Sequence, residues 1–210
     1  MGDIVAAIRL LAERGLNQGA SGNVSVRHGD GFVVTPSGIS ADLLRDDQLV
    51  AMDMAGQWSG HWKPSSEWRF HRDIYAARAD AGAIVHCHSP AATALAVLGK
   101  TLPAFHYMVA IAGGAEVRCA PYATFGTQEL SDAAVAALEG RRACLLAHHG
   151  MIAIGGDLAQ AVDIAVEIEF LCDLYLRLLP LGEPPVLPAK EMAVVLEKFK
   201  SYGANAQRHP

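Results

Sequence analysis

The stretch "AGAIVHCHSPAATALAVLG", residues 81–99, indicates how this chain is organised. Its first part is a short apolar run that ends in polar residues, which predicts a short buried strand. Ser89 and Pro90 follow at once, and a serine cap with proline at the first helical position is typical of a helix start. A strand that leads directly into a helix is the unit from which α/β folds are built.

The same alternation continues along the chain, but hairpin signals lie among the strands. "NVSVR" and "GFVVTPSG" flank "HGDG" at residues 28–31, which predicts a hairpin, and "ACLLAHHGMIAI" at residues 143–154 repeats the buried-strand pattern. We expect helices over residues 3–15 with a stop at Gly15, after Ser65 or Ser66 as the cap, and from Leu158 after the Asp157 and Gln160 pair. These signals predict an α/β fold with a mixed or antiparallel central sheet covered by helices on both sides.

Length and charge restrict the class of protein. A chain of 210 residues predicts one domain over residues 1–210, with a C-terminal tail from about residue 198 that can be mobile. A net charge of −5 without a basic run argues against nucleic acid, and no apolar run is long enough for a membrane helix. The first residues lack the features of a signal peptide, so we expect a cytoplasmic protein. Its cysteines are expected to be reduced and buried: Cys87, Cys119, Cys144 and Cys172.

The sharpest local signal for chemistry is "IVHCHSP", residues 84–90. Side chains two positions apart on a strand lie on the same side, about 7 Å apart, so His86 and His88 can converge on one point at the end of the strand. Cys87 lies on the opposite side and is expected in the core. A single histidine is usually structural, whereas a His-x-His pair at a strand end favours a metal site.

A third ligand can come from "AHHG", residues 147–150. His148 and His149 are neighbours, so on a strand only one of them can join the pair. Gly150 allows a sharp turn there, but this does not choose between the two histidines. Three imidazoles with one open position are the usual arrangement of a catalytic zinc ion, whereas the simpler interpretation is a polar doublet that ends a buried strand.

Glu67 and the small turns near it extend the candidate site. Glu67 could be a fourth ligand or a base, although a carboxylate is also favourable at a helix start. Ser65 and Ser66 offer hydroxyls beside free N–H groups, which suits a phosphate, and "GASGNVS" and "TPSG" are further donor-rich turns. No lysine lies in the apolar setting of a Schiff-base amine, so carbonyl chemistry is expected to use a metal.

These segments together resemble the zinc-dependent class II aldolase and adducin family. The resemblance runs in order over nearly the whole chain, through "GLNQGASGNVSVR", "VTPSGI", "KPSSEWRFH", "IVHCHS", "FHYMVAIAGG", "CAPYATFGT", "LLAHHGMIA" and "VVLEKFKSYG". It implies a mainly antiparallel central sheet covered by helices on both sides. It also implies one zinc ion per subunit and a homotetramer of C4 symmetry whose active sites lie between subunits.

The resemblance assigns roles by position. It implies the zinc ligands His86, His88 and His149, since the third histidine of the family directly precedes the glycine. Glu67 matches a glutamate that contacts the metal in the free enzyme and acts as acid and base. Tyr107 and Tyr202 match tyrosines that reach the site from a neighbouring subunit. The implied substrate-binding residues are Gly22, Asn23, Ser37 (where the family can have threonine), Gly38, Ser65, Ser66 and Phe125.

The implied reaction is reversible cleavage of a ketose 1-phosphate to dihydroxyacetone phosphate and a small aldehyde. In the synthetic direction, Glu67 removes a proton from the carbon next to the carbonyl of dihydroxyacetone phosphate. That carbon attacks the aldehyde, and Tyr107 protonates the alkoxide that forms. L-fuculose 1-phosphate, which yields L-lactaldehyde, is the first expectation, and 5-deoxyribulose 1-phosphate or 5-methylthioribulose 1-phosphate is the alternative. A sugar-phosphate 4-epimerase is disfavoured by glutamate at position 67, and a non-catalytic adducin-like protein by the complete ligand set.

Overall fold

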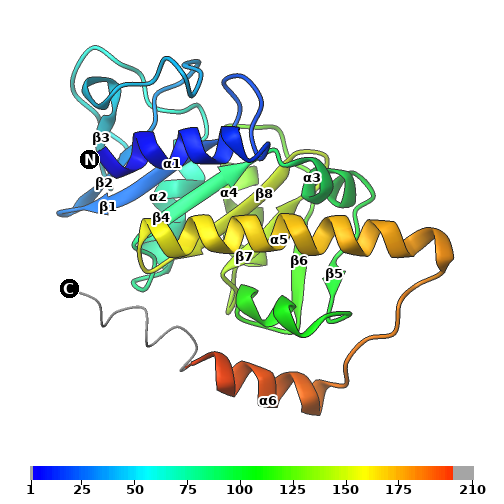
Figure 1. Ribbon diagram of the computed structural model, residues 1–210. Coiled ribbons are helices and arrows are strands. Elements are labelled where there is room, and N and C mark those ends of the chain that lie inside the picture. Colours follow the sequence, from blue (N-terminus) through cyan, green and yellow to red (C-terminus); the bar gives the residue numbers. More distant parts are fainter. Residues whose placement is uncertain (1, 201–210) are drawn as a thin grey trace, which may run out of the picture.

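The computed structural model describes residues 2–200 and builds one eight-stranded sheet with helices on both faces (Figure 1). The strands are β1 (Asn23–His28), β2 (Gly31–Val34), β3 (Val50–Asp53), β4 (Ala83–Cys87), β5 (Leu102–Pro103), β6 (Glu116–Ala120), β7 (Ala143–Leu146) and β8 (Gly150–Gly155). The α-helices are α1 (Gly2–Glu13), α2 (Trp68–Ala77), α3 (Pro90–Val97), α4 (Gln128–Ala137), α5 (Leu158–Leu178) and α6 (Ala189–Phe199). Short 3-10 turns are η1 (Asp46–Gln48), η2 (Tyr107–Ala112) and η3 (Leu179–Leu181).

The strand order is β3-β2-β1-β4-β8-β7-β6-β5. Neighbouring strands are antiparallel except for β6 and β7, which run parallel. The predicted hairpin joins β1 to β2, where His28 pairs with Gly31 and Gly29 takes the positive φ that such a two-residue loop requires. The prediction of a mainly antiparallel sheet within an α/β fold is confirmed.

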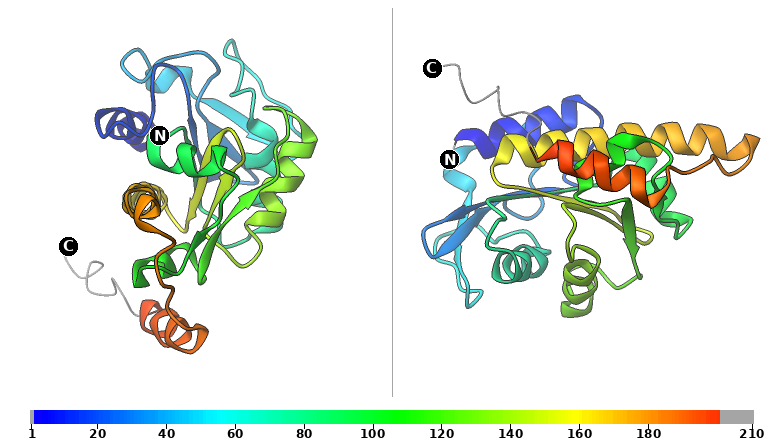
Figure 2. Two further views of the ribbon diagram at one scale, coloured as in Figure 1. Left: turned by 90° about the vertical axis from the view of Figure 1, so that its right-hand side faces the viewer. Right: turned by 90° about the horizontal axis from the view of Figure 1, so that it is seen from below.

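Helices cover both faces of the sheet, as predicted (Figure 2). One core lies under α1, α3 and α5, and the second lies under α2 and α4. Strand alternation divides β4 between them, because Val85 and Cys87 enter the first core and Ile84 enters the second. His86 therefore lies on the α2 side of the sheet, where its ring contacts Phe70.

The predicted start positions of α3 and α5 are confirmed, whereas α2 begins later than predicted. Asp157 caps α5 as predicted, since its side chain accepts the N–H of Gln160 at 2.8 Å. Ser89 stands at the cap of α3 but makes no cap hydrogen bond; instead Glu169 of α5 accepts the first free N–H groups, those of Ala91 and Ala92. A cap from a distant helix satisfies the same donors as a local one.

The helix α2 begins later than the expected cap at Ser65 or Ser66. Glu67 is its N-cap residue, and Trp68 is its first helical residue. At the other end of the chain, α6 packs on η2, and its Met192 lies in one buried cluster with Ala104 and Ala110. Residues 201–210 of the expected tail lie outside the described residues. None of the helices within residues 2–200 has the length and hydropathy of a membrane span.

Candidate active site

Four side chains that are distant in sequence direct their ligand atoms to one point. Glu67 precedes α2, His86 lies on β4, His88 follows β4, and His149 lies in the turn between β7 and β8. Their ligand atoms all lie within 4.8 Å of one another. The Nε2 atoms of His86 and His88 are 3.0 Å apart, and Glu67 places Oε2 at 3.2 Å from His86 Nε2 and Oε1 at 3.3 Å from His149 Nε2.

These separations fit a tetrahedral metal ion. Zinc bonds of about 2.0–2.1 Å at tetrahedral angles separate ligand atoms by roughly 3.3 Å. The Nδ1–H of His86 donates to the carbonyl of Met151 at 2.9 Å, so Nε2 is the ring nitrogen of His86 that faces the centre. Glu67 Oε1 is buried and has no hydrogen-bond partner. Converging lone pairs and an unsatisfied carboxylate oxygen are a donor set that a divalent cation satisfies.

The histidine doublet does not lie on a strand. The strand β7 ends at Leu146 and β8 begins at Gly150, so the expected strand alternation does not decide which histidine joins the site. Instead, His148 adopts a left-handed φ of 57° in the turn, which directs its ring toward Tyr122 while His149 joins His86 and His88.

Gly150 is required for close packing rather than for a turn. A Cβ at this position would lie 2.4 Å from the carbonyl oxygen of Cys87 and 3.2 Å from the ring of His88. The start of β8 therefore lies directly beside the end of β4, its neighbour in the sheet, which brings His149 against the His-x-His pair.

The carboxylate and the imidazoles share a buried, charged environment. Burial alone would raise the pKa of Glu67, but the charges of His86 and His149 and the hydrogen bonds from His86 and Asn23 hold it well below its usual range. Burial and the charge of His86 lower the pKa values of His88 and His149 to about 4. Burial opposes protonation of His86 too, yet Glu67 raises its pKa. A carboxylate and two neutral imidazoles are thus ready to bind a cation at neutral pH.

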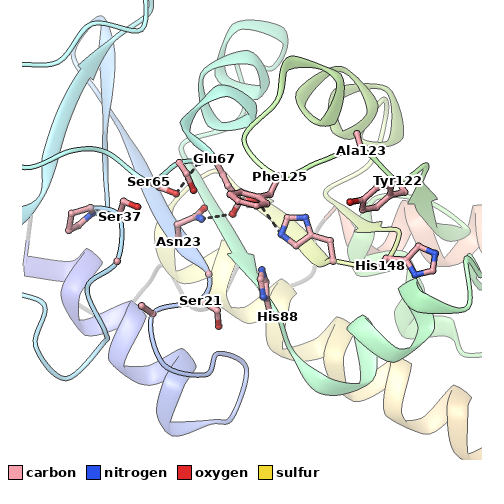
Figure 3. A pocket seen from close by; sticks show the side chains of 16 residues that line it. Ser21, Asn23, Ser37, Ser65, Glu67, His88, Tyr122, Ala123, Phe125 and His148 are labelled. Atoms are coloured by element: carbon pink, nitrogen blue, oxygen red, sulfur yellow. Dashed lines mark hydrogen bonds and ion pairs between the residues drawn. The ribbon is translucent and has the colours of Figure 1, made fainter.

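Glu67, His88 and His149 line a cavity of about 340 Å³ (Figure 3), whereas His86 is fully buried and does not line it. Hydroxyls and small turns line one side of it, and aromatic side chains line the other. None of the residues that line this cavity is a lysine or an arginine. They are Ala20, Ser21, Gly22, Asn23, Pro36, Ser37, Gly38, Ser65, Ser66, Glu67, His88, Tyr122, Ala123, Phe125, His148 and His149.

The donor-rich side of the cavity comes from three turns. Gly22 and Gly38 both have a φ of 75°, which glycine adopts without strain. A Cβ at Gly22 would also clash with the side chain of Asn17 at 2.3 Å. Ser65 and Ser66 lie just before the N-terminus of α2, where the helix dipole favours an anion. This side of the cavity can hold a phosphate without a basic side chain.

Not all the expected site residues lie in this cavity. Phe125 lines it and is 65% exposed, whereas Tyr107 is 51% exposed and does not line it. Tyr202 lies outside the described residues. Asn23 borders the cavity, and its side-chain amide is bonded to both Glu67 and His71.

Tyr122 and His148 were not expected on the cavity wall. Their rings lie 6.0 Å apart, edge to face, on the side away from Ser37 (Figure 3). The segment "APYATFG" contains both Tyr122 and Phe125, and two aromatic residues in a turn rich in small residues are the signal that could have indicated Tyr122.

Comparison with known proteins identifies the family of this chain. Residues 2–176 match the family described as "Class II Aldolase and Adducin N-terminal domain". The chain is 58% identical over 204 residues to a 5-methylthioribulose-1-phosphate/5-deoxyribulose-1-phosphate aldolase of Rhodospirillum rubrum, which covers 97% of this chain and 92% of the relative. It is 51% identical over 190 residues to the L-fuculose phosphate aldolase of Escherichia coli K12, at 90% and 88% coverage.

A solved structure of similar shape is titled "L-fuculose 1-phosphate aldolase". It superposes with a TM-score of 0.92 at 42% identity and covers 95% of both chains. The resemblance inferred from the sequence motifs is confirmed by these similarities.

Proposed function

The chain belongs to the class II aldolase and adducin family and is a class II aldolase, and we propose that it cleaves a ketose 1-phosphate. The products would be dihydroxyacetone phosphate and a small aldehyde, and the reaction would be reversible. The metal would be zinc, one ion per subunit.

The proposal is supported by a metal-binding group and donor-rich turns that border the same cavity. Three members of the histidine and carboxylate group, Glu67, His88 and His149, line the same cavity whose other side offers serine hydroxyls and the backbone N–H groups of small turns. A metal site activates a carbonyl, and a donor-rich turn binds a phosphate, so the two together suit a phosphorylated ketone.

His86, His88, His149 and Glu67 would hold the metal. Bound there, a divalent ion such as zinc supplies Lewis acidity toward the oxygen atoms of the substrate. Glu67 removes the proton from the carbon next to the carbonyl in the synthetic direction and returns it in cleavage. Its lowered pKa keeps the carboxylate in the ionised form at neutral pH, which is the form that a base requires.

The phosphate group would bind between the turns opposite the metal. The hydroxyls of Ser37, Ser65 and Ser66 and the N–H groups at Gly22 and Gly38 are its proposed donors. Binding by neutral donors is consistent with a net charge of −5, since the protein need not supply a basic patch.

The aldehyde end of the substrate would face Phe125 and Tyr122. L-fuculose 1-phosphate is the first candidate substrate, supported by the relatives that carry that name. The second candidate is 5-methylthioribulose 1-phosphate or 5-deoxyribulose 1-phosphate, which is favoured by the 58% identical relative of that name. The aromatic wall suits the apolar methylthio or methyl end of either second candidate.

We also propose a homotetramer in which neighbours complete each site. Tyr107 is 51% exposed and lies outside the cavity of its own chain, which supports a role at the site of an adjacent subunit. We propose that Tyr202 likewise reaches the site of an adjacent subunit. A cytoplasmic location is supported by the cysteines, all of which are free.

A comparison of kcat/KM tests the function and chooses the substrate. The ketoses are the 1-phosphates of L-fuculose, L-rhamnulose, 5-deoxyribulose and 5-methylthioribulose, each measured before chelation, after it, and after zinc is restored. We expect cleavage of at least one, lost on chelation and regained with zinc. Full turnover by metal-free protein, or no cleavage of any of the four, would contradict the proposal.

A further inference from the structure

A buried hydrogen-bond chain leads away from Glu67 into the core. Asn23 Nδ2 donates to Glu67 Oε2 at 2.9 Å, and Asn23 Oδ1 lies 2.6 Å from His71 Nε2. On the far side of the imidazole, His71 Nδ1 lies 2.7 Å from Ser25 Oγ, which is 2.8 Å from the hydroxyl of Tyr75. Each of these residues is at most 6% exposed, so the side chains must satisfy one another.

The regular spacing of residues on α2 and on β1 places these hydrogen-bonding side chains opposite one another. Glu67, His71 and Tyr75 follow one another every fourth residue along the face of α2, while Asn23 and Ser25 alternate along β1. Four residues of helix rise about 6 Å and two residues of strand rise about 6.6 Å, so the two rows stay in register.

The register of β1 carries this row to the metal site. Asn23 pairs with His86 on the neighbouring strand β4. The first member of the row is therefore placed beside a proposed ligand of the metal.

The hydrogen bonds from Tyr75 to Glu67 can take only one order of donors and acceptors. A carboxylate that serves as ligand or base is ionised and only accepts hydrogen bonds, so the Asn23 amide nitrogen must face Glu67 and its oxygen must face His71. His71 Nε2 must then carry the hydrogen, which leaves the Nδ1 lone pair to accept from the Ser25 hydroxyl. Ser25 in turn accepts from Tyr75. A neutral His71 satisfies this order, and burial lowers the pKa of His71 to about 3.

The opposite tautomer would break the contact at the site. With the hydrogen on Nδ1, His71 Nε2 would accept from the Asn23 amide nitrogen, which turns the amide oxygen toward Glu67 Oε2. Two acceptors would then face each other across the 2.9 Å contact in a buried environment, where the repulsion is weakly screened.

We propose that His71 is a positioning residue for the aldolase reaction, with Ser25 and Tyr75 behind it. Ser25 and Tyr75 hold Nδ1 of His71, His71 Nε2 holds the amide oxygen of Asn23, and Asn23 anchors Oε2 of Glu67. The second oxygen, Oε1, has no hydrogen-bond partner, which leaves it to bind the metal ion or to exchange the proton. This inference rests on the proposed function, because it assigns the orientation of the proposed base.

The tautomer can be measured on the unaltered protein. Long-range ¹⁵N–¹H spectra of the histidine rings identify His71 by the signals that disappear in His71→Gln. We expect a neutral ring with the hydrogen on Nε2, in the zinc-loaded and the metal-free protein alike. A hydrogen on Nδ1, or a doubly protonated ring at neutral pH, would overturn the proposal whether or not any sugar phosphate is cleaved.

Two substitutions at His71 then separate positioning from packing. His71→Gln keeps an N–H donor near the place of Nε2, whereas His71→Leu fills the space without one. We expect His71→Leu to lower kcat by about tenfold to a hundredfold, the usual size for residues behind a metal ligand, and to change the visible spectrum of the cobalt-substituted protein. KM and inhibition by inorganic phosphate should stay as in the wild type.

His71→Gln should recover most of the lost kcat and the wild-type cobalt spectrum. Ile74→Val changes a buried residue of the same helix that takes no part in these hydrogen bonds, so it is the control for loss of stability. It should leave kcat and the cobalt spectrum unchanged. Equal behaviour of His71→Gln and His71→Leu, or an unaltered cobalt spectrum in His71→Leu, would contradict the positioning role. If the wild-type protein cleaves none of the ketose phosphates, the proposed function fails, but the tautomer and the cobalt spectrum still decide this inference.

Discussion

Glu67 has two oxygens in different environments, and this difference is what suits it to proton transfer. Asn23 and His86 hold Oε2, while Oε1 has only the ring of His149 nearby at 3.3 Å. A sequence shows that a glutamate stands before a helix, but the amide that anchors one of its oxygens lies 44 residues away. The orientation of the base is therefore a property of the packed molecule.

Glu67→Gln tests the role of that oxygen. An amide cannot accept the substrate proton as a carboxylate does, so we expect exchange of the dihydroxyacetone phosphate proton with solvent deuterium to slow by about 10²–10⁴-fold. Inhibition by inorganic phosphate should change little, and metal content is measured alongside. Ser37→Ala is the matched control, which should weaken phosphate binding and leave exchange at saturating substrate. Unchanged exchange in Glu67→Gln would remove Glu67 as the base.

Measurement of metal content distinguishes the roles of His149 and His148. The ring of His149 joins His86 and His88, while that of His148 is directed at Tyr122. We expect His149→Ala to lose most of its zinc after dialysis and His148→Ala to keep it. His148→Gly serves as the control for backbone strain, because glycine adopts the φ of 57° freely. Retention of zinc by His149→Ala with loss from His148→Ala would reverse the assignment.

At the scale of elements, α2 and α4 are joined by one carboxylate. Asp73 on α2 accepts from Ser131 and Gln128 of α4, both at 2.6 Å, and from Arg72 at 2.7 Å. Burial would raise the pKa of Asp73, but these three hydrogen bonds lower it. The ionised carboxylate therefore stabilises the folded protein at pH values above the pKa that Asp73 has in the unfolded chain, near 3.8. This stabilisation is lost as the pH falls through the lower pKa that Asp73 has in the folded protein.

Asp73→Asn should show this pH dependence. We expect it to cost about 1–2 kcal/mol of unfolding free energy at neutral pH, because charged hydrogen bonds are lost at a partly exposed site. The difference in Tm between wild type and variant should shrink as the pH falls below the unfolded pKa of the carboxyl. Asp163→Asn, at an exposed position of α5, is the control and should show no such trend. A Tm difference that stays constant with pH would contradict the account.

For the whole molecule, the exposed Tyr107 is the feature that a single chain does not explain. It lies on η2, against which α6 packs, so the end of the described chain is held close to the same segment. A tyrosine there can serve the site of a neighbour in a cyclic assembly, which is how the proposed tetramer would complete each cavity.

Mixed tetramers test this sharing of sites. Glu67→Gln and Tyr107→Phe should each be nearly inactive alone, since each removes a different part of every site. After unfolding and refolding together in equal amounts, about a quarter of the sites should combine an intact Glu67 with an intact neighbouring Tyr107, if subunits of a cyclic assembly mix at random. Recovery of about that share of wild-type kcat is expected. No recovery, in a mixture shown to exchange subunits, would place both residues in one chain.

The sequence alone determined the features that depend on short-range periodicity and residue chemistry. Period two along a strand placed His86 and His88 on one side, apolar alternation predicted the layered sheet, and Asp157 marked the start of α5. The inferences from periodicity and capping succeed because strand pleat and helix capping act over a few residues. The motif resemblance predicts His149 as the third metal ligand, and its ring lies beside those of His86 and His88.

Tertiary structure decided what depends on residues far apart in the chain. Glu169 rather than Ser89 caps α3, the turn conformation of His148 separates the two histidines, and the Asn23 amide is used by Glu67 and His71. The bonds from Tyr75 through His71 to Glu67 join α2 to residues of β1 that lie 44 to 50 positions away. Such partners are chosen by sheet register and by the need to satisfy buried polar atoms, which no local pattern encodes.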